Sequence, residues 1–189
     1  MTREKILLRL KTKISEKRLE HSLGVEYTAA ALAMTYGTDI DMARLAGLLH
    51  DCAKGLTAKE KLEKARKHNI PISKVEEKNP DMLHAKLGAF YAKYKYDVED
   101  PEVLSAIECH TTGKPNMTML EKIIFVADYI EPNRRYLKDM DEIRREAFTD
   151  IDACIIHILK NTLDYLEQRE GDIDYMSKMT YNYYVNNSR

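Results

Sequence analysis

Apolar residues along this chain recur mostly at three- and four-residue steps, and the period-two alternation of half-buried strands is almost absent. Only 7 glycines and 5 prolines interrupt the pattern in 189 residues. This spacing predicts an all-α protein. The length fits one domain that can bury its own core without disulfides or structural metal ions. We therefore expect residues 1–189 to form a single helical bundle.

Capping and stop signals divide the pattern into helices. Ser15 is suited to cap a helix that ends at Gly37, while Thr57 and Thr118 each open a capping box with a glutamate three residues later. The predicted helices cover residues 3–14, 16–36, 41–53, 58–68, 81–96, 101–110, 119–130, 140–148 and 150–168. We expect a loop over 70–80, for which a lid is one open role, and a tyrosine-rich tail after the last helix.

The apolar run 42–49 ends abruptly in the neighbours His50 and Asp51. Because the run is apolar enough to be buried, the two side chains follow it into a water-poor region, where an unpaired carboxylate is too costly. A counter-ion or a metal would relieve that cost, and adjacent helical side chains can approach one ion from two sides. On the predicted helix Lys54 returns to roughly the same face, where its ammonium would meet an anion held by that metal.

Other predicted helices also carry polar residues on their apolar faces. The complete set is His21, His50, Asp51, His84, His110 and Asp128. Any single buried histidine is equally well explained as a hydrogen-bonded core residue, but their joint occurrence favours a metal site. Imidazole and carboxylate ligands without thiolate suit iron, manganese, cobalt or zinc, and Asp51 is the natural bridge between two ions. We interpret His68 as a surface helix cap, His157 as structural, and Cys52 and Cys109 as small buried hydrophobes.

Charge and cysteine content narrow the functional classes. The chain has 30 lysines and arginines and 31 aspartates and glutamates, which gives a net charge of −1. No overall positive field would therefore attract nucleic acid. Three cysteines without paired spacing fit a reducing compartment. The chain shows neither a signal-peptide core nor a stretch apolar enough to span a bilayer, so we expect a cytoplasmic protein without a membrane partner. Whether it forms a homodimer stays open.

The order of these polar residues resembles that of the HD-domain metal-dependent phosphohydrolases over roughly residues 18–135: one histidine, a His-Asp doublet, two further histidines and a distant aspartate. Two segments are more specific, His110-Thr111-Thr112-Gly113-Lys114-Pro115 and Ala127-Asp128-Tyr129-Ile130-Glu131-Pro132-Asn133-Arg134. They are similar to the YqeK branch, the bacterial symmetrical bis(5'-nucleosyl)-tetraphosphatases. The resemblance implies an HD-type helical bundle, a binuclear iron-containing site, and hydrolysis of diadenosine tetraphosphate to two ADP. Carried over by position, His21, His50, Asp51 and Asp128 would hold one ion, and Asp51, His84 and His110 the other.

This chemistry suggests roles for the charged residues. We expect hydroxide held between the ions to attack an inner phosphorus, with Asp51 and Lys54 as catalytic residues. Lys54 and Arg134 are the expected phosphate contacts and Arg18 a further candidate, although the pair Arg134-Arg135 is equally well explained as a solvated corner. One alternative is an HD-type hydrolase of a nucleotide monophosphate or a guanosine polyphosphate. The other is a non-catalytic nucleotide-binding module, a class that generally loses ligands, whereas this chain keeps all six.

Overall fold

Helices form every regular element in the part of the chain that the computed structural model describes, residues 1–134, 137–169 and 172–187. They are α1 (Arg3–Lys11), α2 (Glu16–Tyr36), α3 (Ile40–Leu49), α4 (Ala58–Lys67), α5 (Lys74–Lys78), the 3₁₀ helix η1 (Pro80–Leu83), α6 (His84–Tyr96), α7 (Pro101–Cys109), α8 (Met119–Ile130), α9 (Met140–Ala147), α10 (Ile151–Gln168) and α11 (Tyr175–Asn187). The all-α prediction is confirmed. None of these helices has the length and apolarity needed to cross a membrane.

Capping side chains set several helix boundaries where the sequence predicts them. The Ser15 hydroxyl accepts a hydrogen bond from the backbone N–H of Arg18, and Gly37 ends α2 in the left-handed conformation with φ of 65°. Both predicted capping boxes are present, at Thr57 before α4 and at Thr118 before α8. These bonds satisfy backbone donors that the first turn of a helix leaves without partners.

The helix that leads to the His-Asp doublet is shorter than predicted. It ends at Leu49 rather than at residue 53, and the chain continues in tight turns in which the N–H of Cys52 bonds the Leu49 carbonyl and the N–H of Lys54 bonds the Asp51 carbonyl. These bonds span three residues instead of four. The helical-face argument that placed Lys54 beside His50 and Asp51 is therefore wrong in its geometry.

Two segments that the sequence left without regular structure are helical. The expected loop 70–80 contains the five-residue helix α5, which begins at a capping box formed by Ser73 and Glu76. The tyrosine-rich tail forms α11, where buried Tyr184 accepts a hydrogen bond from the N–H of Met117 at 3.1 Å. The tail thus packs on its own bundle.

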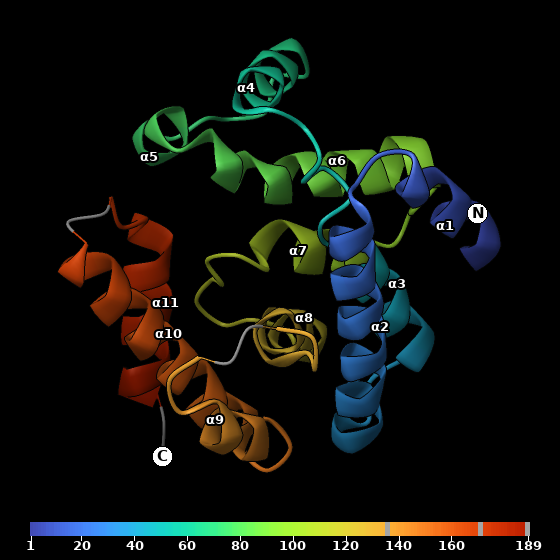
Figure 1. Cartoon of the computed structure of the whole chain (residues 1–189). Coiled ribbons are helices and arrows are strands. Elements are labelled where there is room, and N and C mark those ends of the chain that lie inside the picture. The colour runs from blue at the N-terminus through green and yellow to red at the C-terminus, as the bar shows by residue number, and fades with distance from the viewer. Residues whose placement is uncertain (135–136, 170–171, 188–189) are drawn as a thin grey trace.

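One contiguous apolar core joins the helices. In Figure 1, α8 lies near the middle of the molecule, with α2 and α3 on one side and α9, α10 and α11 on the other. The inner face of α8, which includes Leu120, Ile123 and Ile124, is fully buried. Because α8 packs against α2, α3, α7 and α10, it fixes the relative positions of the helices that carry or precede His21, the His50-Asp51 doublet and His110.

A buried carboxylate ties the first three helices together. Glu26 of α2 receives two hydrogen bonds of 2.7 Å from Arg3 of α1 and is also bonded by Arg44 of α3. With both its oxygens paired to guanidinium groups, its charge is compensated. This ion pair network fixes α1 and α3 on the helix that carries His21.

Gly55 provides a test of how closely the turn after the doublet packs. A methyl group there would lie 2.0 Å from the backbone carbonyl oxygen of Lys13, which cannot rotate away. We expect Gly55→Ala to lower the free energy of unfolding by about 1–3 kcal/mol, measured by chemical denaturation. Gly37→Asn is the control, because Gly37 has open space around it and asparagine tolerates a positive φ. Equal losses in the two variants would contradict this packing argument.

Candidate metal centre

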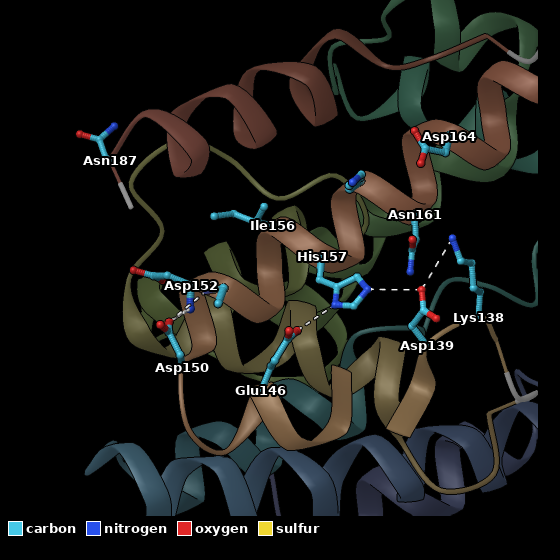
Figure 2. A pocket seen from close by; sticks show the side chains of 12 residues that line it. Lys138, Asp139, Glu146, Asp150, Asp152, Ile156, His157, Asn161, Asp164 and Asn187 are labelled. Carbon is cyan, nitrogen blue, oxygen red and sulfur yellow. Dashed lines mark hydrogen bonds and ion pairs between the residues drawn. The ribbon is translucent and has the colours of Figure 1, made fainter. Parts of the chain in front are cut away.

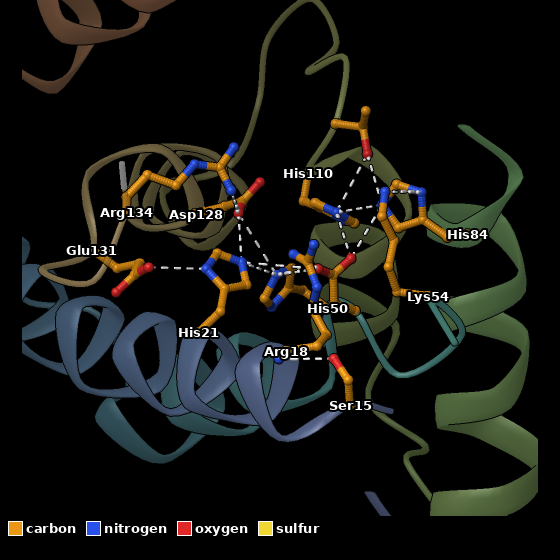
Figure 3. Close-up of polar contacts among 12 residues, drawn as sticks. Ser15, Arg18, His21, His50, Lys54, His84, His110, Asp128, Glu131 and Arg134 are labelled. Carbon is orange, nitrogen blue, oxygen red and sulfur yellow. Dashed lines mark hydrogen bonds and ion pairs between the residues drawn. The ribbon is translucent and has the colours of Figure 1, made fainter. Parts of the chain in front are cut away.

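The structure brings the six predicted polar residues together. Figure 3 labels His21, His50, His84, His110 and Asp128 among them. The six come from different parts of the chain: His21 from α2, His50 and Asp51 from the turn after α3, His84 from the start of α6, His110 from the turn after α7, and Asp128 from α8. Among the described residues, every group of histidine and acidic side chains close enough to hold a metal ion is drawn from these six.

One oxygen of Asp51 faces a first cluster. Its Oδ2 lies 3.4 Å from Nε2 of His50 and 3.8 Å from Nε2 of His21. These two imidazole nitrogens are 3.2 Å apart, and Oδ1 of Asp128 lies 3.0 Å from His21 and 3.7 Å from His50. The same two imidazole nitrogens thus lie within 3.8 Å of an Asp51 oxygen and within 3.7 Å of an Asp128 oxygen.

The other oxygen of Asp51 faces a second cluster. Its Oδ1 lies 3.2 Å from Nε2 of His84 and 3.9 Å from Nε2 of His110, and these two nitrogens are 3.1 Å apart. Asp51 therefore stands between the two clusters and contributes one oxygen to each.

All four histidines present the same ring nitrogen to the site. The Nδ1 atoms of His50, His84 and His110 each bond the backbone carbonyl three residues earlier, and Nδ1 of His21 bonds the carboxylate of Glu131 at 3.0 Å. A carbonyl can only accept, so in those three residues Nδ1 carries the proton and Nε2 keeps a free lone pair. Such an outer partner is what metal-binding histidines usually have.

The ligand atoms of these clusters are better satisfied by metal ions than by hydrogen bonds to one another. Oδ1 of Asp51 is buried without a hydrogen-bond donor, and Asp51 itself is 3% exposed. The facing Nε2 atoms of His84 and His110 bring two lone pairs together with no proton between them. Two ligand atoms that each lie about 2.1 Å from one ion are at most about 4.2 Å apart, a limit that all these distances respect.

The local electrostatics keep both carboxylates and two of the imidazoles in the forms that bind metals, whereas the charges of Asp51 and Asp128 raise the pKa of His50 although burial opposes this. Burial opposes ionisation of Asp51, but the imidazoles around it, His50 first, hold its pKa well below the usual range. The pKa of Asp128 is also lowered against the effect of burial, mainly by the hydrogen bond with His21. Burial lowers the pKa of His84 to about 3 and of His110 to about 4. At neutral pH both carboxylates are therefore ionised and these two imidazoles neutral.

Two arginines contact the carboxylates of the centre. Arg18 donates to Oδ2 of Asp51 at 2.7 Å, and Arg134 donates to Oδ1 of Asp128 at 3.4 Å. About a third of each side chain is exposed, so both can also reach a ligand from solvent. Arg135, the other member of the predicted pair, lies outside the described residues.

Lys54 is close to the second cluster but is already paired. Its ammonium lies 2.8 Å from the carboxylate of Asp81 and 3.3 Å from Nδ1 of His84. Asp81 also accepts from Lys61, and the two lysines lower its pKa to about 2 although burial opposes this. The lysine thus belongs to an ion pair at the edge of the centre.

Three neighbours of the centre were missed by reasoning from the sequence. Glu131 is fully buried and orients His21. Asp81 orients Lys54 through its carboxylate and His84 through its backbone carbonyl. The hydroxyl of Thr111 lies 3.3 Å from Nε2 of His110 and 3.4 Å from Nε2 of His84. Glu131 and Thr111 belong to the two segments that carry the family resemblance. Their roles depend on packing between helices, which helical periodicity does not reveal.

His157 lies apart from the centre, in a cavity of about 850 Å³ between α9 and α10 (Figure 2). Its Nδ1 bonds Glu146 at 3.0 Å and its Nε2 lies 3.6 Å from Asp139. None of the six predicted ligands lines this cavity. Its ring is held between two carboxylates, which agrees with a structural role.

Comparisons with known proteins agree with this geometry. The model of the HD domain family matches residues 18–133. The chain is 37% identical over 188 residues to a Bacillus subtilis protein, and the match covers 100% of both chains. It is 40% identical over 182 residues to a protein from Halalkalibacterium halodurans, and that match covers 96% of both chains. Each relative is named bis(5'-nucleosyl)-tetraphosphatase, symmetrical. A crystal structure from Clostridium acetobutylicum, described as a predicted HD superfamily hydrolase involved in NAD metabolism, superposes with a TM-score of 0.95 at 38% identity and covers 98% of both chains.

The family match spans more than half of the chain and contains all six polar residues of the centre. The similarity to the two relatives extends from end to end. This chain belongs to the HD-domain family, in the group whose full-length relatives are named symmetrical bis(5'-nucleosyl)-tetraphosphatases.

Proposed function

We propose that this protein hydrolyses diadenosine tetraphosphate symmetrically, releasing two molecules of ADP. The observation that carries the proposal is the paired cluster centred on Asp51, found in a chain whose full-length relatives are named for this activity. A site for two cations suits a substrate whose reacting part is a chain of four phosphates, because the charge of the phosphates must be neutralised before a nucleophile can approach.

His21, His50, Asp51 and Asp128 hold one metal ion in this proposal, and Asp51, His84 and His110 hold the other. Iron is the metal we propose, with manganese, cobalt and zinc also compatible with imidazole and carboxylate ligands. When bound, two such ions lower the pKa of a water towards neutrality and neutralise charge on phosphoryl oxygens.

The chain's own cations position the phosphates. Arg18 and Arg134 each use one nitrogen on a ligand carboxylate and keep further N–H donors for phosphate oxygens at the exposed side of the centre. Lys54 has three N–H donors, of which Asp81 takes one. We therefore assign substrate binding to Arg18, Lys54 and Arg134, and a catalytic role to Asp51 and Lys54.

Attack by water on an inner phosphorus accounts for the products. The new bond joins the water oxygen to that phosphorus, the bridging oxygen leaves with the second ADP, and the released proton goes to solvent. Cysteines adjoin two of the ligands, but burial raises the pKa values of Cys52 and Cys109 to about 12, so both stay as inert thiols. A covalent intermediate on these residues is not expected.

The alternatives left open by the sequence differ in substrate, because every HD-type reaction would share the metal ligands. A panel of diadenosine tetraphosphate, a nucleotide monophosphate and a guanosine polyphosphate, assayed with anaerobically metal-loaded protein, separates them. We expect diadenosine tetraphosphate to have the highest kcat/KM. A non-catalytic module would turn over none of the three.

The bridging position of Asp51 predicts unequal effects on metal content. Asp51→Ala should remove both ions, because it deletes a ligand from each cluster, whereas His84→Ala should mainly weaken the second. Elemental analysis of the purified variants measures this, with Asp164→Ala, an exposed carboxylate on α10, as the control. Full metal content and activity in Asp51→Ala would overturn the binuclear assignment.

Lys54 should matter for substrate and not for metal. Lys54→Ala removes a charge-assisted hydrogen bond to phosphate, so we expect a loss of about 2 kcal/mol in transition-state binding, roughly 30-fold in kcat/KM, with metal content intact. Lys59→Ala, on the exposed face of α4, is the matched control. Unchanged kinetics would leave Lys54 with only its ion pair to Asp81.

Labelled water tests the reaction type and the site of attack together. A single turnover in heavy-oxygen water should place one label in only one of the two ADP products, on its terminal phosphate, because water attacks an inner phosphorus directly. Mass spectrometry of the products reads this out. AMP and ATP as products would contradict symmetrical cleavage, and a phosphorylated protein trapped by rapid quenching would contradict direct attack even if two ADP formed.

A further inference from the structure

We propose that the cavity formed by α5, the loop after α7 and the first turn of α11 binds one nucleoside of the dinucleotide. The inference rests on the proposed function and assigns a substrate-binding role to the C-terminal helix. In Figure 1, α5 and the start of α11 lie on the same side of the molecule. The cavity has a volume of about 650 Å³, within the roughly 300–1,000 Å³ range of small-molecule sites.

Thr111 lies between the cavity and the metal centre. This residue lines the cavity, and its hydroxyl lies 3.3–3.4 Å from the Nε2 atoms of His84 and His110. Met82 and Ala85, on either side of His84 in the chain, line it as well. A phosphate chain held at the second cluster would therefore lie next to this wall of the cavity.

The charge of the cavity suits the uncharged part of the substrate. Its charged lining residues are Lys74, Lys86 and Lys114 against Glu76, Glu108 and Asp174. Three positive and three negative groups leave no net charge, and Lys86 and Lys114 are already paired with Glu76 and Glu121. Such a cavity does not favour a polyphosphate. The carboxylates of Glu108 and Asp174 are suitable acceptors for ribose hydroxyls.

Tyr175 supplies an aromatic surface for the base. It is the first residue of α11, lines the cavity and is 73% exposed, so its ring is accessible for stacking. Its neighbour Met176 adds a polarisable apolar contact. Stacking on an aromatic ring is sequence-tolerant binding that every nucleobase can use.

Contacts of α11 and of the segment before it link the helix that carries Tyr175 to the other walls. Thr180 of α11 packs so closely on the loop after α7 that a methyl group on Gly113 would lie 2.8 Å from its side chain. The hydroxyl of Tyr184 bonds Met117 at the end of that loop, and Lys78 of α5 pairs with Asp172 at 2.9 Å. These contacts join all three walls, so the cavity is largely formed before substrate binds.

ADP and inorganic pyrophosphate together test the assignment, because they share two phosphates and differ by the nucleoside. Calorimetry on anaerobically iron-loaded protein should show that Tyr175→Ala weakens ADP binding by about tenfold and pyrophosphate binding by less than twofold. Tyr175→Phe should restore ADP binding, since the ring is retained. Tyr165→Ala, an exposed tyrosine on α10 outside the cavity, should change neither affinity.

Equal weakening of ADP and pyrophosphate, or no weakening of ADP, would overturn the nucleoside assignment. If Tyr175→Ala fails to fold, photolabelling of the unaltered protein with 8-azido-ADP decides, with label expected within 73–86, 105–114 or 174–176 and label elsewhere contradicting the proposal. The proposed function is tested separately by the products of diadenosine tetraphosphate. If the products are not two ADP, the proposed function fails, but a selective loss of ADP binding in Tyr175→Ala would still support the cavity assignment. If the products are two ADP and Tyr175→Ala binds ADP normally, only the cavity assignment fails.

Discussion

Burial of the Asp51 carboxylate is the constraint on which the centre depends. An ionised carboxylate inside an apolar bundle is unfavourable unless it is compensated, and four imidazoles and Arg18 surround this one. Its Oδ1 has no donor. Metal ions would complete the compensation on both sides, which makes the fold and the metal site parts of a single energetic arrangement.

Helix ends explain how the fold supplies the ligands. His50 and His110 each cap the C-terminus of a helix and bond the carbonyl three residues earlier, in the last turn, where carbonyls lack their usual helical partner. The same bond therefore satisfies a backbone acceptor, fixes the ring tautomer and aims Nε2 at the centre. His84 repeats this arrangement at the start of α6 with the carbonyl of Asp81.

The sequence was sufficient for the parts that depend on periodicity and capping. Polar residues on apolar helical faces identified the residues that the structure gathers, and Ser15, Thr57 and Thr118 fixed helix starts. It could not reveal contacts that arise only when helices pack, such as Glu131 behind His21. Lys54 illustrates the limit, because its position was deduced from a helix that ends at Leu49, before the doublet. Likewise α11 was not foreseen, since its tyrosines form no clear apolar stripe.

The central claim is that Asp51 bridges two metal ions, and anomalous diffraction from crystals of anaerobically iron-loaded protein tests it most directly. The account predicts two peaks about 3.5–4 Å apart, one beside His21, His50 and Asp128 and the other beside His84 and His110, with one Asp51 oxygen on each. A single peak, or two peaks of which neither contacts Asp51, would contradict it.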